Sequence, residues 1–153
     1  MENLVIKKAA PDDAYDLSLI ETQCFSTPWS EKSLKEFINC DSSHVLTASV
    51  DDKTVGYIGM YYSFGEGDIT NVAVMNNYRN MGIAKKLISE LIELSKKTGI
   101  SILRLEVRQS NIVAISLYKK FGFYEVGIRK NYYSHPKENA VLMDLNIDTA
   151  TDL

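Results

Sequence analysis

The hydrophobic pattern is most regular over residues 67–99, where a strand-like segment leads into a helix-like one. Residues 68–74 contain the β-branched Ile69, Val72 and Val74 and no proline, a pattern that favours a strand. From Ile83 onward, apolar residues recur at helical spacing until Gly99, a residue suited to ending a helix. We therefore predict a strand over 68–74, a loop, and a helix from 83 to the residues before Gly99.

The preceding part of the chain predicts further helices and strands. They are a strand over 4–8, a helix that opens at Pro11 and continues to Phe25, a helix from Ser30 to about Cys40, and strands over 45–50 and 54–63 joined by a turn at 51–53. Proline is tolerated in the first turn of a helix, and Ser30 is a favourable N-cap. The two strands and their short polar turn indicate a hairpin.

The segment after Gly99 alternates cleanly between apolar and charged residues. Over 102–108, one face carries Leu103, Leu105 and Val107 and the other carries Arg104, Glu106 and Arg108. A helix capped by Ser110-Asn111 and ended by Gly122 follows, then strands over 123–132 and 139–145 around a turn at His135-Pro136. Strands, helices and hairpins around one βαβ unit predict a mixed sheet flanked by helices. We expect one domain over residues 1–147 and a loose tail over 148–153.

Composition narrows the class of protein. Hydrophobic residues make up 45% and charged residues 24% of the chain, which is ordinary for a soluble globular domain. The net charge of −3 argues against direct binding of nucleic acid, and no apolar run reaches the roughly 20 residues that cross a membrane. Cys24 and Cys40 form no Cys-x-x-Cys pair and no signal peptide precedes them, which favours the cytoplasm. Cys40 and His44 are too few ligands for a metal site, so we expect none.

The loop before the long helix carries the first candidate chemistry. In Arg79-x-x-Gly82-x-Ala84, small residues let the backbone approach a ligand closely, and the free N–H groups of the following helix point back at the loop. Both features favour phosphate, and Lys85 adds positive charge. An ordinary strand–helix connection that contains a glycine is the alternative.

The residues around this loop distinguish a phosphate site from an ordinary strand–helix connection. The pattern Val-x-x-x-x-Arg-x-x-Gly-x-Ala over 74–84 resembles the acetyl-CoA motif of the GNAT family of N-acetyltransferases, and it is neither a P-loop nor a dinucleotide fingerprint. The resemblance implies the GNAT fold, an α/β (mixed α+β) architecture with a mostly antiparallel sheet of about seven strands and about four helices. It also implies acetyl-CoA as cofactor, with these binding residues: Val72, Val74, Arg79, Asn80, Met81, Gly82, Ile83, Ala84, Lys85, Asn111 and Tyr118.

Segments elsewhere are similar to one branch of that family, the bacterial ribosomal-protein-alanine N-acetyltransferases (RimI type). They are Pro28–Lys32, Leu105–Asn111, Ala114–Phe123 and Arg129–Tyr133. The resemblance implies acetyl transfer to the N-terminal alanine of ribosomal small-subunit protein eighteen, by direct transfer in a ternary complex. It makes Glu106 the general base and Tyr118 the general acid, with a backbone N–H near Val74 at the oxyanion. From the residues alone, Glu106 could belong to a surface charge ladder and Tyr118 to the core.

The acceptor end of the cleft is expected between two aromatic pairs, Phe25 with Trp29 and Tyr132 with Tyr133, although each could simply cover apolar surface. Acidic partners for a basic substrate are Glu21, Glu66 and Asp68. We expect a monomer or weak dimer. The rival functions are acetylation of another amine (lysine, polyamine or small molecule) and a non-catalytic CoA-binding regulatory module.

Overall fold

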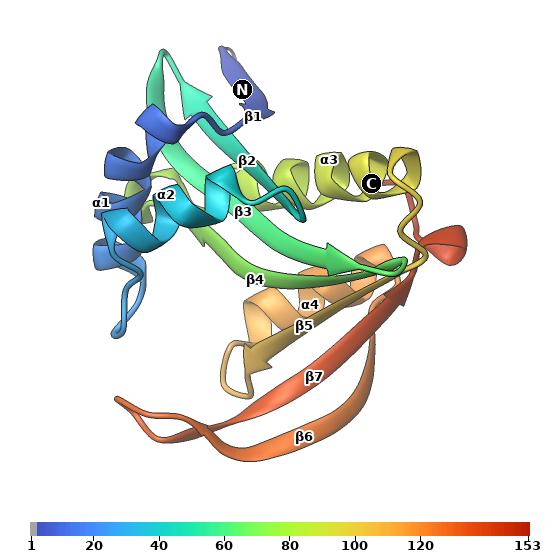
Figure 1. Cartoon of the computed structure of the whole chain (residues 1–153). Coiled ribbons are helices and arrows are strands. Elements are labelled where there is room, and N and C mark those ends of the chain that lie inside the picture. Colours follow the sequence, from blue (N-terminus) through green and yellow to red (C-terminus); the bar gives the residue numbers. More distant parts are fainter. Residues whose placement is uncertain (1–2) are drawn as a thin grey trace.

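A computed structural model describes residues 3–153 of the protein, and residues 1 and 2 of the predicted domain lie outside it (Figure 1). The strands are β1 Leu4–Lys8, β2 Ser43–Val50, β3 Lys53–Ser63, β4 Glu66–Val74, β5 Ile102–Arg108, β6 Tyr124–Tyr133 and β7 Glu138–Asn146. The helices are α1 Ala14–Cys24, α2 Glu31–Asn39, α3 Ile83–Lys97 and α4 Ile112–Phe121, with 3-10 turns at Pro11–Asp13, Asn76–Tyr78 and Ile147–Thr149.

The strands form a 7-stranded sheet in the order β1-β2-β3-β4-β5-β7-β6. Only β4 and β5 run parallel, and every other neighbouring pair is antiparallel. The predicted mixed, mostly antiparallel sheet is therefore confirmed. The parallel pair is joined through α3, the crossover that such a pair requires.

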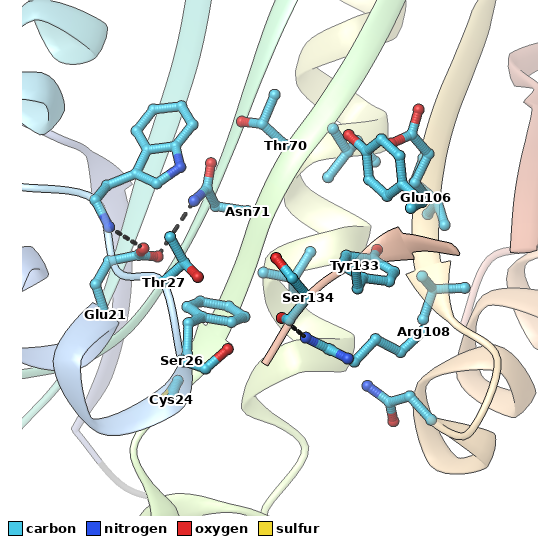
Figure 2. A pocket seen from close by; sticks show the side chains of 18 of the residues that line it. Glu21, Cys24, Ser26, Thr27, Thr70, Asn71, Glu106, Arg108, Tyr133 and Ser134 are labelled. Atoms are coloured by element: carbon cyan, nitrogen blue, oxygen red, sulfur yellow. Dashed lines mark hydrogen bonds between the residues drawn. The ribbon is translucent and has the colours of Figure 1, made fainter. Parts of the chain in front are cut away.

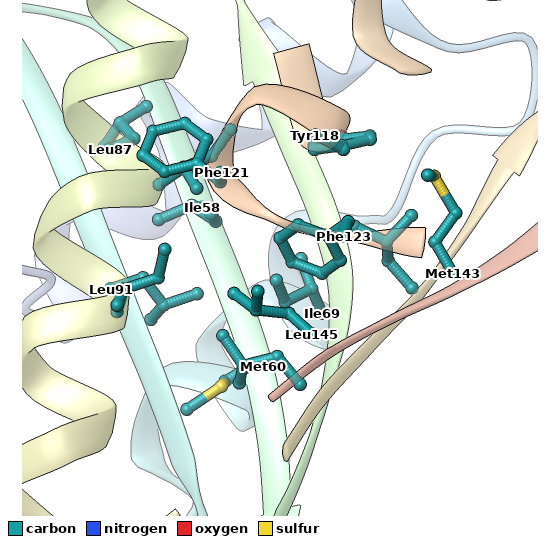
Figure 3. Close-up of a cluster of buried hydrophobic side chains, with 14 of the residues drawn as sticks. Ile58, Met60, Ile69, Leu87, Leu91, Tyr118, Phe121, Phe123, Met143 and Leu145 are labelled. Carbon is teal, nitrogen blue, oxygen red and sulfur yellow. The ribbon is translucent and has the colours of Figure 1, made fainter. Parts of the chain in front are cut away.

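The helices cover both faces of the sheet, α1 and α2 on one and α3 and α4 on the other (Figure 1). Successive side chains of a strand point to opposite faces, so in β3 Tyr57 packs with α1 and α2 whereas Ile58 packs with α3. The larger cluster joins α3 and α4 to β5 and β7 through residues such as Leu91, Phe121 and Leu145 (Figure 3).

The predicted helix ends are confirmed by their caps. The Ser30 hydroxyl accepts from the Ser33 N–H at 3.1 Å, and the Asn111 side chain accepts from the Ala114 N–H at 3.2 Å. Gly122 follows α4 with a φ of 110°, in the left-handed region that a glycine reaches without strain.

Two local predictions need correction. Lys53 belongs to β3, so the hairpin turn is the pair Asp51-Asp52, with φ of 49° and 66°. Two residues in this conformation match the twist of the flanking strands better than a longer turn does. The helix predicted to open at Pro11 begins as a 3-10 turn, in which the Asp13 carboxylate accepts from the Ala10 N–H at 2.7 Å.

The segment expected to be a loose tail begins with the 3-10 turn Ile147–Thr149, and the Thr151 N–H donates to Phe121 O at 2.8 Å. Within residues 3–153, no helix is both long enough and apolar enough to cross a lipid bilayer.

The sheet opens between β4 and β5. These strands pair only from Glu66 to Ile69 of β4, and β4 bulges at Thr70, which has no partner in the β3 register. A bulge bends its strand and often lies beside an active site. Beyond it, β4 and β5 diverge (Figure 1).

Gly59→Ala is expected to lower the free energy of unfolding by about 1–3 kcal/mol, the usual cost of overfilling a packed core. A Cβ at this position would lie 2.5 Å from the fully buried ring of Phe37. Urea unfolding measures the loss. Gly127→Ala is the matched control, because its Cβ meets no atom within 4 Å. Equal destabilisation by both substitutions would contradict the prediction.

Candidate active site

A cavity of about 620 Å³ opens where β4 and β5 diverge. Its walls are residues 69–72 of β4, 105–108 of β5, the end of α1 with the loop that follows, and the end of β6 with the turn that follows. Tyr118 of α4 and Asn111, which caps that helix, complete the lining. Figure 2 shows Glu106, Arg108 and Tyr133 on one side and Glu21 and Cys24 on the other. The cavity therefore brings together segments that are up to about a hundred residues apart in sequence.

Glu106 faces this cavity from the polar face of β5. Its side chain is 31% exposed and forms an ion pair with Arg129 of β6 at 3.4 Å. The other charged residues of that face are also paired, Arg104 with Glu66 and Arg108 with Glu138. The charge ladder anticipated as an alternative is thus present, and Glu106 is its one carboxylate in the cavity wall.

Tyr118 lies on α4 with its ring 5.6 Å from that of Phe123. The residue is 7% exposed and lines the cavity. Burial, with a smaller contribution from Tyr133, raises the pKa of the Tyr118 phenol. The phenol therefore keeps its proton through the neutral range, as a proton donor must.

A backbone edge of β4 forms a further wall. The Met75 N–H donates to Val55 O of β3, and antiparallel pairing alternates, so the N–H groups of Val72 and Val74 face the side where β5 has turned away. Val72 lies in the cavity wall. Its N–H is a candidate donor to a ligand in the cavity, whereas Val74, around which such a donor was expected, is not among the described residues that line it.

The predicted phosphate loop has an open backbone with two left-handed residues. Asn80 and Gly82 have φ of 62° and 80°, and a Cβ added at Gly82 would meet no atom within 4 Å. The Lys86 N–H donates to Gly82 O, so the N–H groups of Ile83 and its two successors come before the hydrogen-bond ladder of α3. A helix start with free donors and an open glycine fits a pyrophosphate.

The Arg79 guanidinium, expected among the cofactor-binding residues, contacts the ends of β4 and α1. Its Nε donates to Val74 O at 3.1 Å, and its Nη2 lies 3.5 Å from Cys24 Sγ. The Cys24 thiol donates to the same carbonyl at 3.4 Å. Arg79 thus ties the start of the phosphate loop to the end of α1, and the exposed Lys85 remains as the loop's cation.

The two aromatic pairs expected at the acceptor end lie on opposite sides of the cavity. Trp29 packs on Phe37 with ring centroids 5.2 Å apart, and Phe25 is 39% exposed. Tyr132 and Tyr133 meet edge to face at 5.0 Å, where the register of β6 against β7 shifts between Arg129 and Tyr133. Burial and the nearby Glu106 charge raise the pKa of Tyr133 to about 12.

A buried polar cluster beneath the cavity was only partly anticipated. Glu21, expected as an acidic partner for a basic substrate, is 1% exposed and accepts three hydrogen bonds. They come from the Trp29 N–H at 2.8 Å, the Tyr57 hydroxyl at 2.6 Å and the Asn71 amide at 3.2 Å (Figure 2). Nothing in the sequence marks Tyr57 or Asn71, because their partner lies 36 and 50 residues away.

The other two anticipated acidic partners are not in the cavity wall. Glu66 and Asp68 lie on β4 before the bulge, where β4 still pairs with β5, and Glu66 is bonded to Arg104 at 2.9 Å. Of these carboxylates and Glu106, two line the cavity, Glu21 and Glu106, and only Glu106 is exposed enough to meet a basic substrate.

The fold and the site together are those of a class of acyltransferase. They combine an open parallel strand pair, a candidate phosphate loop at the start of α3 and a cavity between β4 and β5. The sequence pattern of the Acetyltransferase (GNAT) family matches residues 14–123, and the chain belongs to that family. It is an N-acetyltransferase, and the family generally uses acetyl-CoA.

More particular relatives share most of the chain. It is 35% identical over 144 residues to the [ribosomal protein bS18]-alanine N-acetyltransferase of Haemophilus influenzae, covering 91% of this chain and 96% of that one. The crystal structure of the ribosomal-protein-S18-alanine N-acetyltransferase from Escherichia coli superposes with a TM-score of 0.89 at 30% identity, covering 97% of each chain. Ard1 from Thermoplasma volcanium superposes with a TM-score of 0.85 at 27% identity, covering 94% of this chain and 97% of that chain.

Proposed function

We propose that the protein transfers acetyl from acetyl-CoA to the α-amine of an N-terminal alanine, that of ribosomal protein bS18, in the cytoplasm. The names and extent of its relatives support this substrate. The observation that carries the proposal is the single cavity that holds Glu106, Tyr118 and the free β4 edge at Val72.

Acetyl-CoA fits the free helix start and the open space at Gly82, which would hold its pyrophosphate. Ile83, Ala84 and Lys85 would donate their backbone N–H groups there, and Asn80 and Met81 complete the loop. Asn111 and Tyr118 extend the same site along α4 to the cavity. Bound acetyl-CoA would supply a thioester, whose acyl carbon an amine can attack.

The chain's own groups then have separate tasks in direct transfer. The Glu106 carboxylate takes a proton from the attacking amine, directly or through a water molecule. The Val72 N–H donates to the carbonyl oxygen as negative charge develops on it. The Tyr118 hydroxyl gives its proton to the departing sulfur, and the aromatic pairs Phe25–Trp29 and Tyr132–Tyr133 enclose the first residues of the peptide. No cysteine acyl-enzyme step is involved.

The test is release of CoA from acetyl-CoA with a short peptide that begins Ala-Arg, beside the same peptide with a blocked N-terminus. We expect turnover with the free amine alone. Turnover of a blocked peptide that contains a lysine would indicate a lysine acetyltransferase instead. Binding of acetyl-CoA without turnover of any amine would indicate a non-catalytic module.

The pH profile of kcat/KM is expected to rise with deprotonation of the peptide α-amine, whose pKa is about 7.7–8.0, and then to stay level. The Tyr118 pKa is raised above its ordinary 10.0, so the acid stays protonated below that pH. Initial rates from about pH 6 to 10 measure the profile. A falling limb that begins below pH 9 and disappears in Tyr118→Phe would contradict it.

A further inference from the structure

The Glu21 carboxylate forms hydrogen bonds with three separate segments around the cavity. Its Oε1 accepts from the Trp29 backbone in the loop after α1, and its Oε2 accepts from Tyr57 of β3 and Asn71 of β4. Among residues 3–153 it forms no ion pair with a cation. A buried carboxylate held only by neutral donors is costly, so its position demands a reason beyond packing.

This arrangement fixes the direction of the Asn71 amide. A carboxylate can only accept, so the Asn71 Nδ2 must face Glu21 and the Oδ1 must face away. That oxygen is buried and has no hydrogen-bond partner in the described part of the chain. An unpaired buried acceptor is unfavourable, and a donor supplied by a ligand would remove that cost.

Asn71 lies in the cavity wall, one residue before Val72 and one after the Thr70 bulge. Its side chain points to the α1 side of the sheet, where Phe25 and Trp29 form the acceptor wall. The missing donor therefore belongs to the acceptor substrate.

We infer that Asn71, oriented by Glu21, is a specificity residue whose Oδ1 accepts the first peptide N–H of the acceptor, the one that follows its N-terminal residue. This inference rests on the proposed function and deepens it. A peptide N-terminus carries that N–H two carbons from its amine, whereas a lysine side chain or a polyamine has only methylene groups there. The hydrogen-bond acceptor Oδ1 of Asn71 thus favours a peptide α-amine over other amines of similar reactivity.

The deciding experiment compares an alanine peptide with the depsipeptide in which the first peptide N–H is replaced by an ester oxygen. CoA release gives kcat/KM for each. We expect the wild-type protein to prefer the amide by about 10-fold, the scale of one buried hydrogen bond. Equal use of both substrates by the wild type would overturn the inference, and this comparison requires no variant to fold.

Asn71→Leu then tests the contact, because leucine keeps the volume and removes the acceptor. It also removes the Nδ2 donor to Glu21, so the readout is the ratio of amide to ester kcat/KM within each variant. The ratio of kcat/KM for the peptide to that for the depsipeptide should fall to near one, while acetyl-CoA affinity stays unchanged. Thr47→Val is the control, since it removes a buried polar group, a hydroxyl, from the same sheet outside the cavity and should keep the full preference. A preference that persists in Asn71→Leu would overturn the assignment. If the wild type acetylates neither substrate, the proposed function fails and the assignment fails with it.

Discussion

Glu106→Gln is expected to slow turnover by about 100-fold or more, the usual effect of removing a positioned general base. Glutamine keeps the shape of the side chain in the β5 wall and cannot take the proton of the attacking amine. Tyr118→Phe is expected to have an effect of similar size, because it removes the proton for the departing thiolate. Steady-state rates of CoA release with an alanine peptide measure both.

Acetyl-CoA affinity should be nearly unchanged in both variants, because neither alters the phosphate loop and Tyr118→Phe keeps the aromatic ring that lines the cofactor site. Arg104→Gln is the matched control for Glu106: it lies two residues earlier on the same face of β5, is likewise ion-paired, and is outside the cavity. It should keep wild-type turnover. Full activity in Glu106→Gln and Tyr118→Phe would remove both residues from the mechanism.

Gly82→Val is expected to weaken acetyl-CoA binding by about 100-fold or more, about 2.8 kcal/mol. The Cβ of residue 82 would project into space that is open in the protein and is needed by the pyrophosphate. Its φ of 80° would also strain a β-branched residue, which pulls the loop out of shape. Isothermal titration with acetyl-CoA measures the loss.

Gly99→Val separates these two effects. Gly99 follows the other end of α3 with a φ of 76°, and a Cβ there also meets no atom within 4 Å. It therefore carries the same backbone strain without facing a ligand. Both variants should lose thermal stability, but only Gly82→Val should lose affinity. Wild-type affinity in Gly82→Val would move the cofactor site away from this loop.

Features set by near neighbours in the chain were predictable from sequence. Ser30 and Asn111 cap helices, and Gly122 ends one, because each acts on residues within one turn of itself. The GNAT motif could also be recognised from sequence, since its glycine and its helix start are adjacent in the chain.

Features that depend on contacts across the sheet were not predictable from sequence. The bulge at Thr70 is defined by its register against β3, and the Glu21 cluster joins positions up to 50 residues apart. The direction of the Arg79 side chain follows from where α1 ends, which no local pattern encodes. The residues of the candidate site could therefore be named from sequence, but the support beneath them could not.

The short parallel pairing of β4 with β5 also bears on how the chain folds. Residues before α3 contribute β1 to β4 and residues after it contribute β5 to β7, so the junction divides the sheet at one point in the sequence. Most pairing on each side joins strands close in sequence, which favours rapid folding of each part. The cluster around Phe121 and Leu91 then couples the two. The opening between β4 and β5 lies where these two parts of the sheet meet, and its backbone amides should exchange hydrogen sooner than those of the paired strands beside it.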